Sequence, residues 1–303
     1  MTACFKKATG EMSGIFSGLR SGFKRQSRVA SRGNKPLIVS FTGGIGAQIF
    51  SLAIALNLKK RGEPFGVDLS YFEQDPKLAA VGDGVSIWPW GLEYLGHSAA
   101  DVAALGSIER EDGRFLPDSL LKFRMGISAM ADHSVRAHFP RRASVENFLK
   151  LGITDPIPDL PYVAFHLRRG DYLNVASHVV PDDDYLGLMG RLSRTIPAAI
   201  VVSDSSLSQD FISFCEERFP RIAFLDGLSY EPGEIHHLLR NASIHVGSNG
   251  QFSLTAGLLS DTLFLTPKKF FVGLDAYDSF LSGLSNFSAL DIRTGGGVPG
   301  SAE

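Results

Sequence analysis

Residues 37–68 read LIVSFTGGIGAQIFSLAIALNLKKRGEPFGVD. The apolar, β-branched run at 37–41 predicts a buried strand, and a glycine-rich turn follows it. Residues 47–61 are apolar almost throughout and end in three basic residues before Gly62, the chemistry of a helix C-terminus. A second apolar run at 65–67 predicts another strand. This order of strand, helix and strand predicts a parallel sheet covered by helices.

The same alternation returns after residue 161. Strands are predicted at 162–167, 199–203, 222–225, 243–247 and 262–266. Helices are predicted between them, at about 184–195, 207–219, 233–241 and 251–259. This rhythm predicts a second doubly wound α/β domain. From 71 to 160 the pattern is broken, and only short helices around 99–105 and 144–151 are predicted.

We therefore divide the chain into four segments. These are a basic leader (1–35), a first α/β domain (36–155), a second α/β domain (156–285) and a flexible, glycine-rich tail (286–303). The two Rossmann-like halves are expected to face each other across a cleft. Ligands in such folds bind at the carboxyl ends of the strands, where the motifs described below fall.

Composition and charge exclude several classes of protein. With 303 residues, 44% hydrophobic and 20% charged, the chain is globular rather than disordered or collagen-like. Residues 1–35 hold eight Lys/Arg and one acidic residue, a net charge of +7, so the remaining chain carries −9 of the total of −2. An acidic body excludes a broad surface for nucleic acid, so any phosphate must be bound at a local site.

The cellular location of the protein is less constrained by the sequence. Two cysteines, Cys4 and Cys215, are too few for a disulfide framework or a zinc site, and both are interpreted as inert thiols. No apolar run reaches the roughly 20 residues of a membrane span, and no clear secretory signal is present. The basic leader with its spaced apolar residues fits a membrane-surface anchor, a transit peptide or a disordered extension. The expected location is cytoplasmic or peripheral to a membrane.

The most informative motif is HLRRGDY at 166–172, at the end of a predicted strand. Side chains alternate along a strand, so His166 and Arg168 share one face and form a donor array for a phosphorylated ligand. Arginine suits this task because its planar fork binds phosphate oxygens bidentately. The alternative is that Arg168 or Arg169 pairs with Asp171 to fix the turn. We favour a functional role for Arg168 and the structural role for Arg169.

Two further strand ends carry polar residues. Asp204 follows the strand at 199–203 and is expected either to accept hydrogen bonds from a guanine edge or to cap the next helix. The segment SNGQFS at 248–253 starts another helix. Its backbone N–H groups and hydroxyls predict a pyrophosphate site or, alternatively, a plain helix cap. The residues assigned to this loop are Ser248, Asn249, Gln251, Phe252 and Ser253.

The glycine-rich turn at 42–50 lets backbone approach a ligand closely, with Gly43, Gly44, Gly46 and Gln48 as the contacting residues. Asp68 lies 22 residues after Gly46, as in a dinucleotide-binding fingerprint. However, Ile49 replaces the third glycine, which disfavours a nicotinamide or flavin cofactor.

Taken together, these motifs resemble those of the α-1,2-fucosyltransferase family. GGIGAQIF at 43–50 resembles the family's GGxGNQxF, and HLRRGDY at 166–172 is similar to its HxRRGDY. VSD at 202–204 resembles its FSDD, and the block at 238–271 is similar to its NSSFSWW…APKKWF ending. Order and spacing agree over roughly residues 37–272.

The resemblance implies a GT-B-like fold and transfer of L-fucose from GDP-fucose, with inversion, to a hydroxyl of a galactose-containing glycan, the 2-OH of a galactoside. It implies no metal and no further cofactor. By motif position, Arg168 would stabilise the β-phosphate of the leaving GDP, and His166 and Asp204 would contact the nucleoside. Asp171, the glycine turn and the 248–253 loop complete the donor site.

Departures from the family pattern keep alternatives open. Ala47 stands where the family has Asn, and Leu254 and Thr255 lie in the stretch that usually holds two tryptophans. The chain is therefore a fucosyltransferase, a transferase of another GDP-deoxyhexose, or a non-catalytic binder of sugar nucleotides or glycans. The candidates for a general base are Asp68, His178 and the run at 182–184. His236 and His237, adjacent on a predicted helix, are interpreted as solvated and not as a metal pair.

Overall fold

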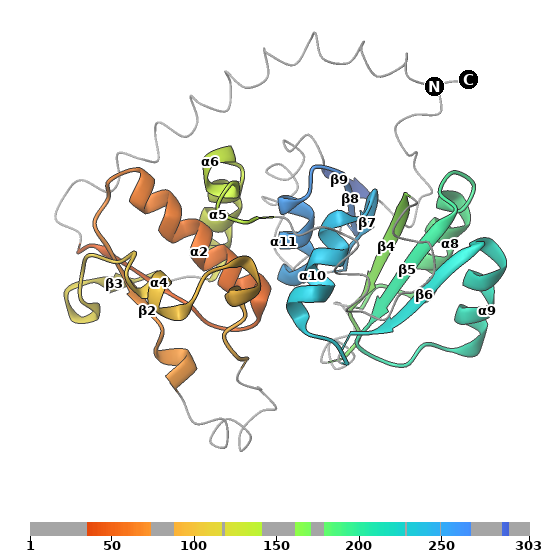
Figure 1. Cartoon of the computed structure of the whole chain (residues 1–303), viewed down its shortest axis with the longest axis horizontal. Coiled ribbons are helices and arrows are strands. Elements are labelled where there is room, and N and C mark those ends of the chain that lie inside the picture. Colours follow the sequence, from red (N-terminus) through yellow and green to blue (C-terminus); the bar gives the residue numbers. More distant parts are fainter. Residues whose placement is uncertain are drawn as a thin grey trace, which may run out of the picture.

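The computed structural model describes residues 35–73, 88–116, 119–140, 161–170, 179–227, 229–248, 250–267 and 287–290. Within these ranges the chain forms two parallel sheets, each with its own helices, lying side by side (Figure 1). The predicted α/β, GT-B-like fold is confirmed by this pair of parallel sheets. The domain boundary predicted near residue 155 lies outside the described residues.

The first sheet has the strand order β2-β1-β3, with β1 at Leu37–Ser40, β2 at Phe65–Asp68 and β3 at Arg114–Phe115. Helix α2 (Ile45–Lys60) joins β1 to β2, as predicted, and starts two residues earlier than expected. It is apolar almost all round because other helices cover it, above all α5 (Ser119–Met130), α6 (His133–Arg136) and α11 (Gln251–Leu259). The shorter elements are η2 (Ser70–Glu73), η3 (Leu92–Leu95), α4 (Ala99–Ala103) and η4 (Arg110–Asp112).

The second sheet has six strands in the order β6-β5-β4-β7-β8-β9, and every neighbouring pair is parallel. Counted from its first strand this is the order 3-2-1-4-5-6 of a dinucleotide-binding fold, in which ligands bind where the order reverses, here between β4 and β7. The strands are β4 (Tyr162–Leu167), β5 (Ala198–Ser203), β6 (Arg221–Asp226), β7 (Ile244–Val246), β8 (Leu263–Pro267) and β9 (Phe287–Leu290).

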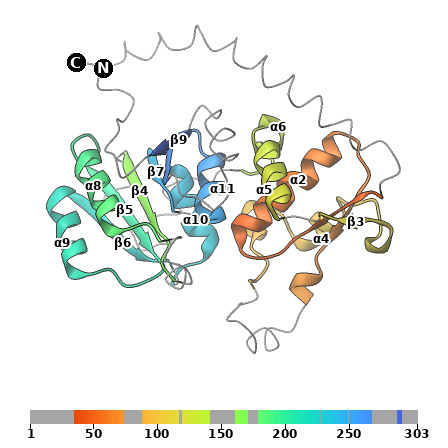
Figure 2. The ribbon, with the colours of Figure 1, turned by 180° about the vertical axis from the view of Figure 1, so that it is seen from behind.

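Helices cover both faces of this sheet. Helices α8 (Asp182–Leu192) and α9 (Gln209–Arg218) pack on the face formed by Val163, Phe165 and Val201. Helices α10 (Pro232–Asn241) and α11 pack on the opposite face, over Ala164, Ile200 and Val202. From both sides of the molecule, α10 and α11 lie between the two sheets and α8 and α9 lie on the outside (Figures 1 and 2).

Helix α11 belongs to both halves of the structure. Its residues Leu254, Leu258 and Leu259 are buried in the same apolar core as α2. Gly46, in the first turn of α2, lies so close to α11 that a Cβ atom there would come within 2.5 Å of the backbone carbon of Gln251. The two sheets are therefore connected by direct helix packing.

The structure corrects the sequence predictions in a few places. Residues 287–290, predicted as part of a flexible tail, form β9 beside β8. The prediction extended too far because the glycine-rich composition starts only at Thr294. Strand β3 and helices α5 and α6 were not predicted, and the helix predicted at 144–151 lies outside the described residues. None of the described helices is both long and apolar enough to cross a lipid bilayer.

Candidate functional site

The candidate site is built on the carboxyl ends of β4 and β5. These strands pair in parallel with Leu167 opposite Ser203, so the residues that follow, Arg168 and Asp204, come out side by side. The Nε atom of Arg168 lies 3.4 Å from Oδ2 of Asp204, and both side chains are largely buried. The register of a regular sheet therefore brings together two residues that are 36 positions apart in the sequence.

Asp204 holds the turn that follows β4. Its Oδ1 atom accepts hydrogen bonds from the backbone N–H groups of Arg169 (2.5 Å) and Gly170 (3.0 Å). A Cβ atom on Gly170 would lie 2.8 Å from Oδ2 of the same carboxylate, so a side chain here would push the Asp204 carboxylate aside. Both oxygens of the Asp204 carboxylate thus contact residues 168–170. Ser208, not Asp204, caps α9, since its side chain accepts the N–H of Phe211.

Within the described residues, the contacts of Arg169 serve to fix the fold. Its guanidinium donates to the carbonyl of Val180 at 2.9 Å and forms an ion pair with Asp182 in the first turn of α8. These contacts tie the end of β4 to the start of α8. Asp171 and His178, the other residues predicted in this region, lie outside the described residues.

His166 is buried beneath the same edge, with only 6% of its surface exposed. Its Nδ1 atom lies 2.6 Å from the hydroxyl of Ser253 and 3.2 Å from that of Ser248. Burial, aided by the charge of Arg168, lowers the pKa of His166 to about 3. The imidazole is therefore neutral near pH 7. It adds no positive charge to the donor array expected from the sequence, and Arg168 supplies that charge.

The start of α11 is arranged around His166. The Ser253 hydroxyl also accepts the backbone N–H of Ser248 at 3.1 Å, so both serines brace the imidazole. Within the described residues, Gly250 is the N-cap of α11 and forms no side-chain cap. Phe252 packs its ring against the imidazole, with 5.3 Å between ring centroids. Asn249 lies outside the described residues.

The glycine turn approaches this edge from the first sheet. Gly43 has a φ of 73°, a left-handed conformation that favours glycine. Gln48 is fully buried and holds the turn in place, since it donates to the carbonyls of Gly43 and Pro89 and accepts the N–H of Gly91. Its side chain is thus used to position backbone, and the ligand-facing groups of this turn are those of the glycines.

Trp88 lies over the glycine turn. A Cβ atom on Gly44 would be 3.4 Å from the Trp88 indole, and 37% of the Trp88 surface is exposed. The backbone N–H of Trp88 donates to the hydroxyl of Tyr71 at 3.2 Å, which fixes the main chain here. The structure therefore presents an exposed indole face beside backbone that a ligand could approach.

The prediction that His236 and His237 are solvated is wrong, since both are fully buried. Helix α10 is covered by the second sheet on one side and by Tyr94 of η3 on the other. The hydroxyl of Tyr94 bonds Nδ1 of His236 at 2.9 Å, and Nε2 of His236 bonds the Thr255 hydroxyl at 3.1 Å. A hydrogen-bonded chain thus runs from η3 through α10 to α11. Burial is the main cause that lowers the pKa of His236 well below its usual value.

Asp68, a candidate base, lies at the carboxyl end of β2. Its carboxylate contacts the Ser40 hydroxyl at 3.4 Å, the Ser70 N–H at 3.2 Å and Nε of Arg110 at 3.6 Å. Nearby, Nζ of Lys122 donates to the carbonyl of Ser40 at 2.8 Å, and burial lowers the pKa of this lysine to about 8. Within the described ranges, no group of His, Cys, Asp or Glu side chains is placed to hold a metal ion.

Several residues of this region could not be identified from the sequence. Trp88 appeared only as part of a break in the helical pattern, and Tyr94 and Lys122 belong to elements whose position was not predicted. Cys215, in contrast, is buried as expected of an inert thiol, and burial raises its pKa to about 12.

Comparisons with known proteins find only distant similarity, and only among solved structures. No family model and no curated protein sequence matches it. Among solved structures, the NodZ α-1,6-fucosyltransferase soaked with GDP-fucose is 14% identical, with a TM-score of 0.42 over 75% of this chain and 93% of NodZ.

Two further structures are equally distant. POFUT1 in complex with GDP is 11% identical, with a TM-score of 0.44 over 77% of this chain and 96% of POFUT1. The E. coli heptosyltransferase WaaC with ADP is 11% identical, with a TM-score of 0.42 over 77% of this chain and 87% of WaaC. Similarities this distant say nothing about the chemistry of the site.

Proposed function

We propose that this chain is an inverting glycosyltransferase that moves L-fucose from GDP-fucose to a hydroxyl of a glycan acceptor, the 2-OH of a galactoside. The observation that carries the proposal is the pairing of Arg168 with Asp204 at the carboxyl ends of β4 and β5. An arginine held in this way, inside the motif that resembles HxRRGDY, is preorganised to bind the phosphate of a leaving nucleotide.

Arg168 has the central role in this mechanism. As the bond between the sugar and the β-phosphate breaks, negative charge grows on the phosphate oxygen. A guanidinium fixed in advance stabilises that charge more than it stabilises the ground state. The contact with Asp204 uses Nε, the inner nitrogen of the guanidinium. The two terminal nitrogens of the guanidinium are proposed to bind the phosphate.

His166 is proposed to contribute one hydrogen bond. The Ser253 hydroxyl already accepts the N–H of Ser248, so it can donate its own proton to Nδ1 of His166. A neutral imidazole then carries its proton on Nε2, for which no described residue is a partner. This N–H is a donor for an oxygen of GDP-fucose. The pyrophosphate would lie between this group, the start of α11 and the backbone of Gly43 and Gly44.

No metal is needed in this scheme, because Arg168 and two helix N-termini supply the positive potential. In the described part of the chain, α2 and α11 both start at glycine N-caps, which leave the first N–H groups without a side-chain cap from that position. A base near the acceptor hydroxyl would take up its proton. Asp68 and His178 remain the candidates, as does the run at 182–184 in the first turn of α8.

A non-catalytic role is the alternative that one observation favours. Ala47, in the first turn of α2, offers no side-chain amide at the position where the resembled family has Asn. Transfer of another GDP-deoxyhexose is a second alternative, because the contacts to the nucleotide would be the same.

The decisive experiment combines calorimetric titration of GDP-fucose with linkage analysis of products from a panel of β-galactosides, in buffer containing EDTA. Arg168→Ala is expected to lower kcat by about 10²–10³-fold, while the affinity for GDP falls by less. Arg168→Lys keeps the positive charge but not the planar guanidinium, so its kcat should lie between those of the parent and Arg168→Ala. If the parent protein neither binds GDP-fucose nor hydrolyses it, the proposal fails. If it binds without turnover, the non-catalytic alternative holds.

A further inference from the structure

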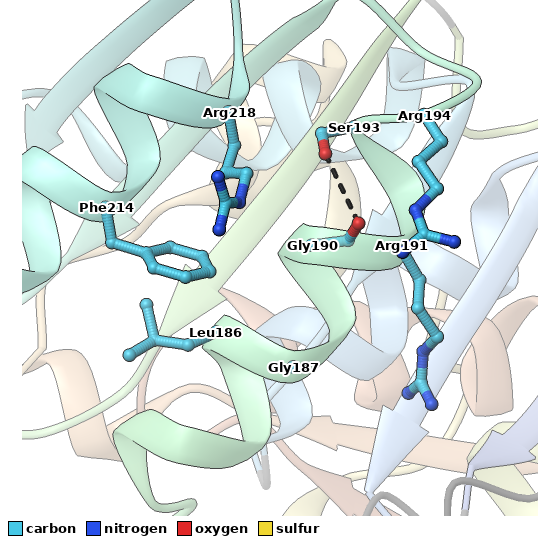
Figure 3. A pocket seen from close by; sticks show the side chains of 8 residues that line it. All are labelled: Leu186, Gly187, Gly190, Arg191, Ser193, Arg194, Phe214 and Arg218. Atoms are coloured by element: carbon cyan, nitrogen blue, oxygen red, sulfur yellow. Dashed lines mark hydrogen bonds between the residues drawn. The ribbon is translucent and has the colours of Figure 1, made fainter.

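An open pocket of about 560 Å³ lies between α8 and α9, on the outer face of the second sheet. Figure 3 shows α9 with Phe214 and Arg218 on one side and the backbone of α8 on the other. Its volume is in the range of pockets that hold small organic ligands. The residues that line it are Leu186, Gly187, Gly190, Arg191, Ser193, Arg194, Phe214 and Arg218.

Three of the eight lining residues are arginines. Within the part of the chain that the structure describes, Arg191, Arg194 and Arg218 form no ion pair. The Nε atom of Arg191 is buried and has no hydrogen-bond acceptor. Three unneutralised cations are gathered at one place on a body whose net charge is −9, so the pocket is strongly attractive to an anion.

Arg218 is also held in position. Its guanidinium carbon lies 4.8 Å above the ring of Phe214, which is four positions earlier on the same face of α9. This cation–π contact orders a long side chain that would otherwise be mobile. An ordered guanidinium loses less entropy when it binds an anion.

The floor of the pocket contains two glycines within α8. A Cβ atom on Gly187 would meet nothing within 4 Å, and one on Gly190 would meet only the Phe214 ring at an ordinary 3.8 Å. Packing therefore does not require glycine at either position. Glycine inside a helix is less stable than alanine by about 1 kcal/mol. What the two glycines provide is open space and exposed backbone on the side of α8 that faces the pocket.

The pocket lies far from the candidate donor site. Arg194 comes four residues before β5 starts at Ala198, and Arg218 comes three residues before β6 starts at Arg221. The pocket is therefore near the amino edge of the sheet, whereas Arg168 and Asp204 lie at its carboxyl edge. A ligand here would not contact the nucleotide of the proposed reaction.

We propose that this pocket, named the α8–α9 pocket, binds a phosphate-bearing small molecule. Arginine forks bind phosphate oxygens bidentately, and Leu186 and Phe214 provide an apolar wall for the organic part of the ligand. The phosphate is that of a free organophosphate or of a phospholipid headgroup, two sources with the same chemistry. The inference does not depend on the proposed transferase activity.

Calorimetric titration with glycerol 3-phosphate tests the soluble source, using the full chain with GDP present in excess to occupy the donor site. The triple variant Arg191→Gln/Arg194→Gln/Arg218→Gln should weaken binding by at least about tenfold. Lys59→Gln/Arg114→Gln/Arg124→Gln changes the net charge equally at exposed positions away from the pocket and should bind like the parent.

Cosedimentation with phosphatidylcholine vesicles, with and without phosphatidylglycerol, tests the lipid source. All variants keep the basic residues 1–35, so a difference between the two triple variants reports the pocket alone. Loss of vesicle binding only in the arginine variant identifies a headgroup, and loss of glycerol 3-phosphate binding identifies a free organophosphate. If both triple variants behave alike in both assays, or the parent binds in neither, the arginines only stabilise helix ends and the proposal is overturned.

Gly187→Ala gives a second, independent test that does not change the charge. The substitution should raise the melting temperature by roughly 2–4 °C, because alanine is the better helix former and nothing obstructs its methyl group. It should also weaken binding of the phosphate probe severalfold, because the methyl group lies on the pocket floor. If the variant binds as tightly as the parent, the ligand does not lie on α8 and the proposal fails.

Discussion

A Cβ atom on Gly46, in the first turn of α2, would lie 2.5 Å from the backbone carbon of Gln251 and 2.6 Å from the backbone nitrogen of Phe252. Backbone atoms cannot move aside as a flexible side chain can. The starts of α2 and α11 therefore touch because residue 46 has no side chain. Through this contact the glycine turn of the first sheet lies against the segment that braces His166 in the second.

Gly46→Ala is accordingly expected to force α2 and α11 apart. The overpacking should lower the free energy of unfolding by about 1–3 kcal/mol despite the better helix propensity of alanine. Urea denaturation measures the loss. Gly187→Ala, where the added Cβ meets nothing within 4 Å, is the matched control and should not destabilise the protein. Equal stability of Gly46→Ala and the parent would show that the two helices are not in backbone contact.

Asp204 is expected to act on catalysis through Arg168. In Asp204→Asn the amide oxygen can still accept the N–H groups of Arg169 and Gly170, but its NH₂ group would face Nε of Arg168, donor against donor. The guanidinium should then shift, and kcat should fall by about 10–100-fold while the fold is retained. Steady-state kinetics and a thermal melt separate the two effects.

The double variant Asp204→Asn/Arg168→Ala provides the control for this positioning role. If Asp204 acts only by holding Arg168, the double variant should be no slower than Arg168→Ala alone, a fully non-additive cycle. Additive losses would instead mean that Asp204 acts on the substrate independently.

The features of this site that depend on local sequence could be predicted, whereas those that depend on contacts between distant segments could not. The strand predicted at 162–167 and the helix predicted at 251–259 have the same bounds in the structure. Buried apolar runs and a polar helix start are local signals that a sequence shows directly. The pairing of Arg168 with Asp204 depends on strand register, and a single sequence does not contain that register. The Asp204 segment SDSS matches a helix start equally well, and only the structure shows that Ser208 is the cap.

Other features depend on contacts between segments that are far apart in the sequence. Gly126 lies in the middle of α5 and would be taken for a helix breaker, but a Cβ there would come within 2.6 Å of the Phe50 ring. The glycine is needed for close packing against α2, so local propensity misleads. His236 was placed on a solvated face because the partner that covers it, Tyr94, comes from a distant segment with no predicted structure.

The buried histidines predict a stability that depends on pH. Burial lowers the pKa of His166 to about 3 and the pKa values of His236 and His245 well below the usual range, so all three are neutral in the folded protein. In the unfolded chain they take up protons near pH 6.5. The unfolded state thus binds more protons below that pH, and folding stability is lost as the pH falls. Between pH 6.5 and 5.5 the free energy of unfolding should fall by roughly 1 kcal/mol per histidine.

His245→Phe should reduce this dependence by about one third. His245 is fully buried in β7 next to Phe264, and neither ring nitrogen has a hydrogen-bond partner within the described part of the chain. A phenyl ring therefore loses no bond there. His133→Gln, at an exposed position of α6, is the control and should leave the pH dependence unchanged. A free energy of unfolding that stays constant between pH 6.5 and 5.5 would contradict neutral burial of the three rings.

Trp88 is predicted to be the platform for the sugar acceptor, a prediction that rests on the proposed transferase function. Its indole lies against Gly44, and 37% of its surface is exposed, so one apolar face is free to pack on a sugar ring. Trp88→Ala should raise KM for the β-galactoside by about tenfold. The affinity for GDP and the slow hydrolysis of GDP-fucose should not change, because Arg168 and His166 are untouched.

Phe115→Ala removes another exposed aromatic side chain, 42% exposed on β3, and should leave KM for the acceptor as in the parent. The Trp88 backbone bond to Tyr71 does not involve the indole, so the fold of this segment should survive Trp88→Ala, as a thermal melt would verify. A parallel loss of GDP affinity and acceptor affinity in Trp88→Ala would mean that the indole supports the glycine turn and not the acceptor.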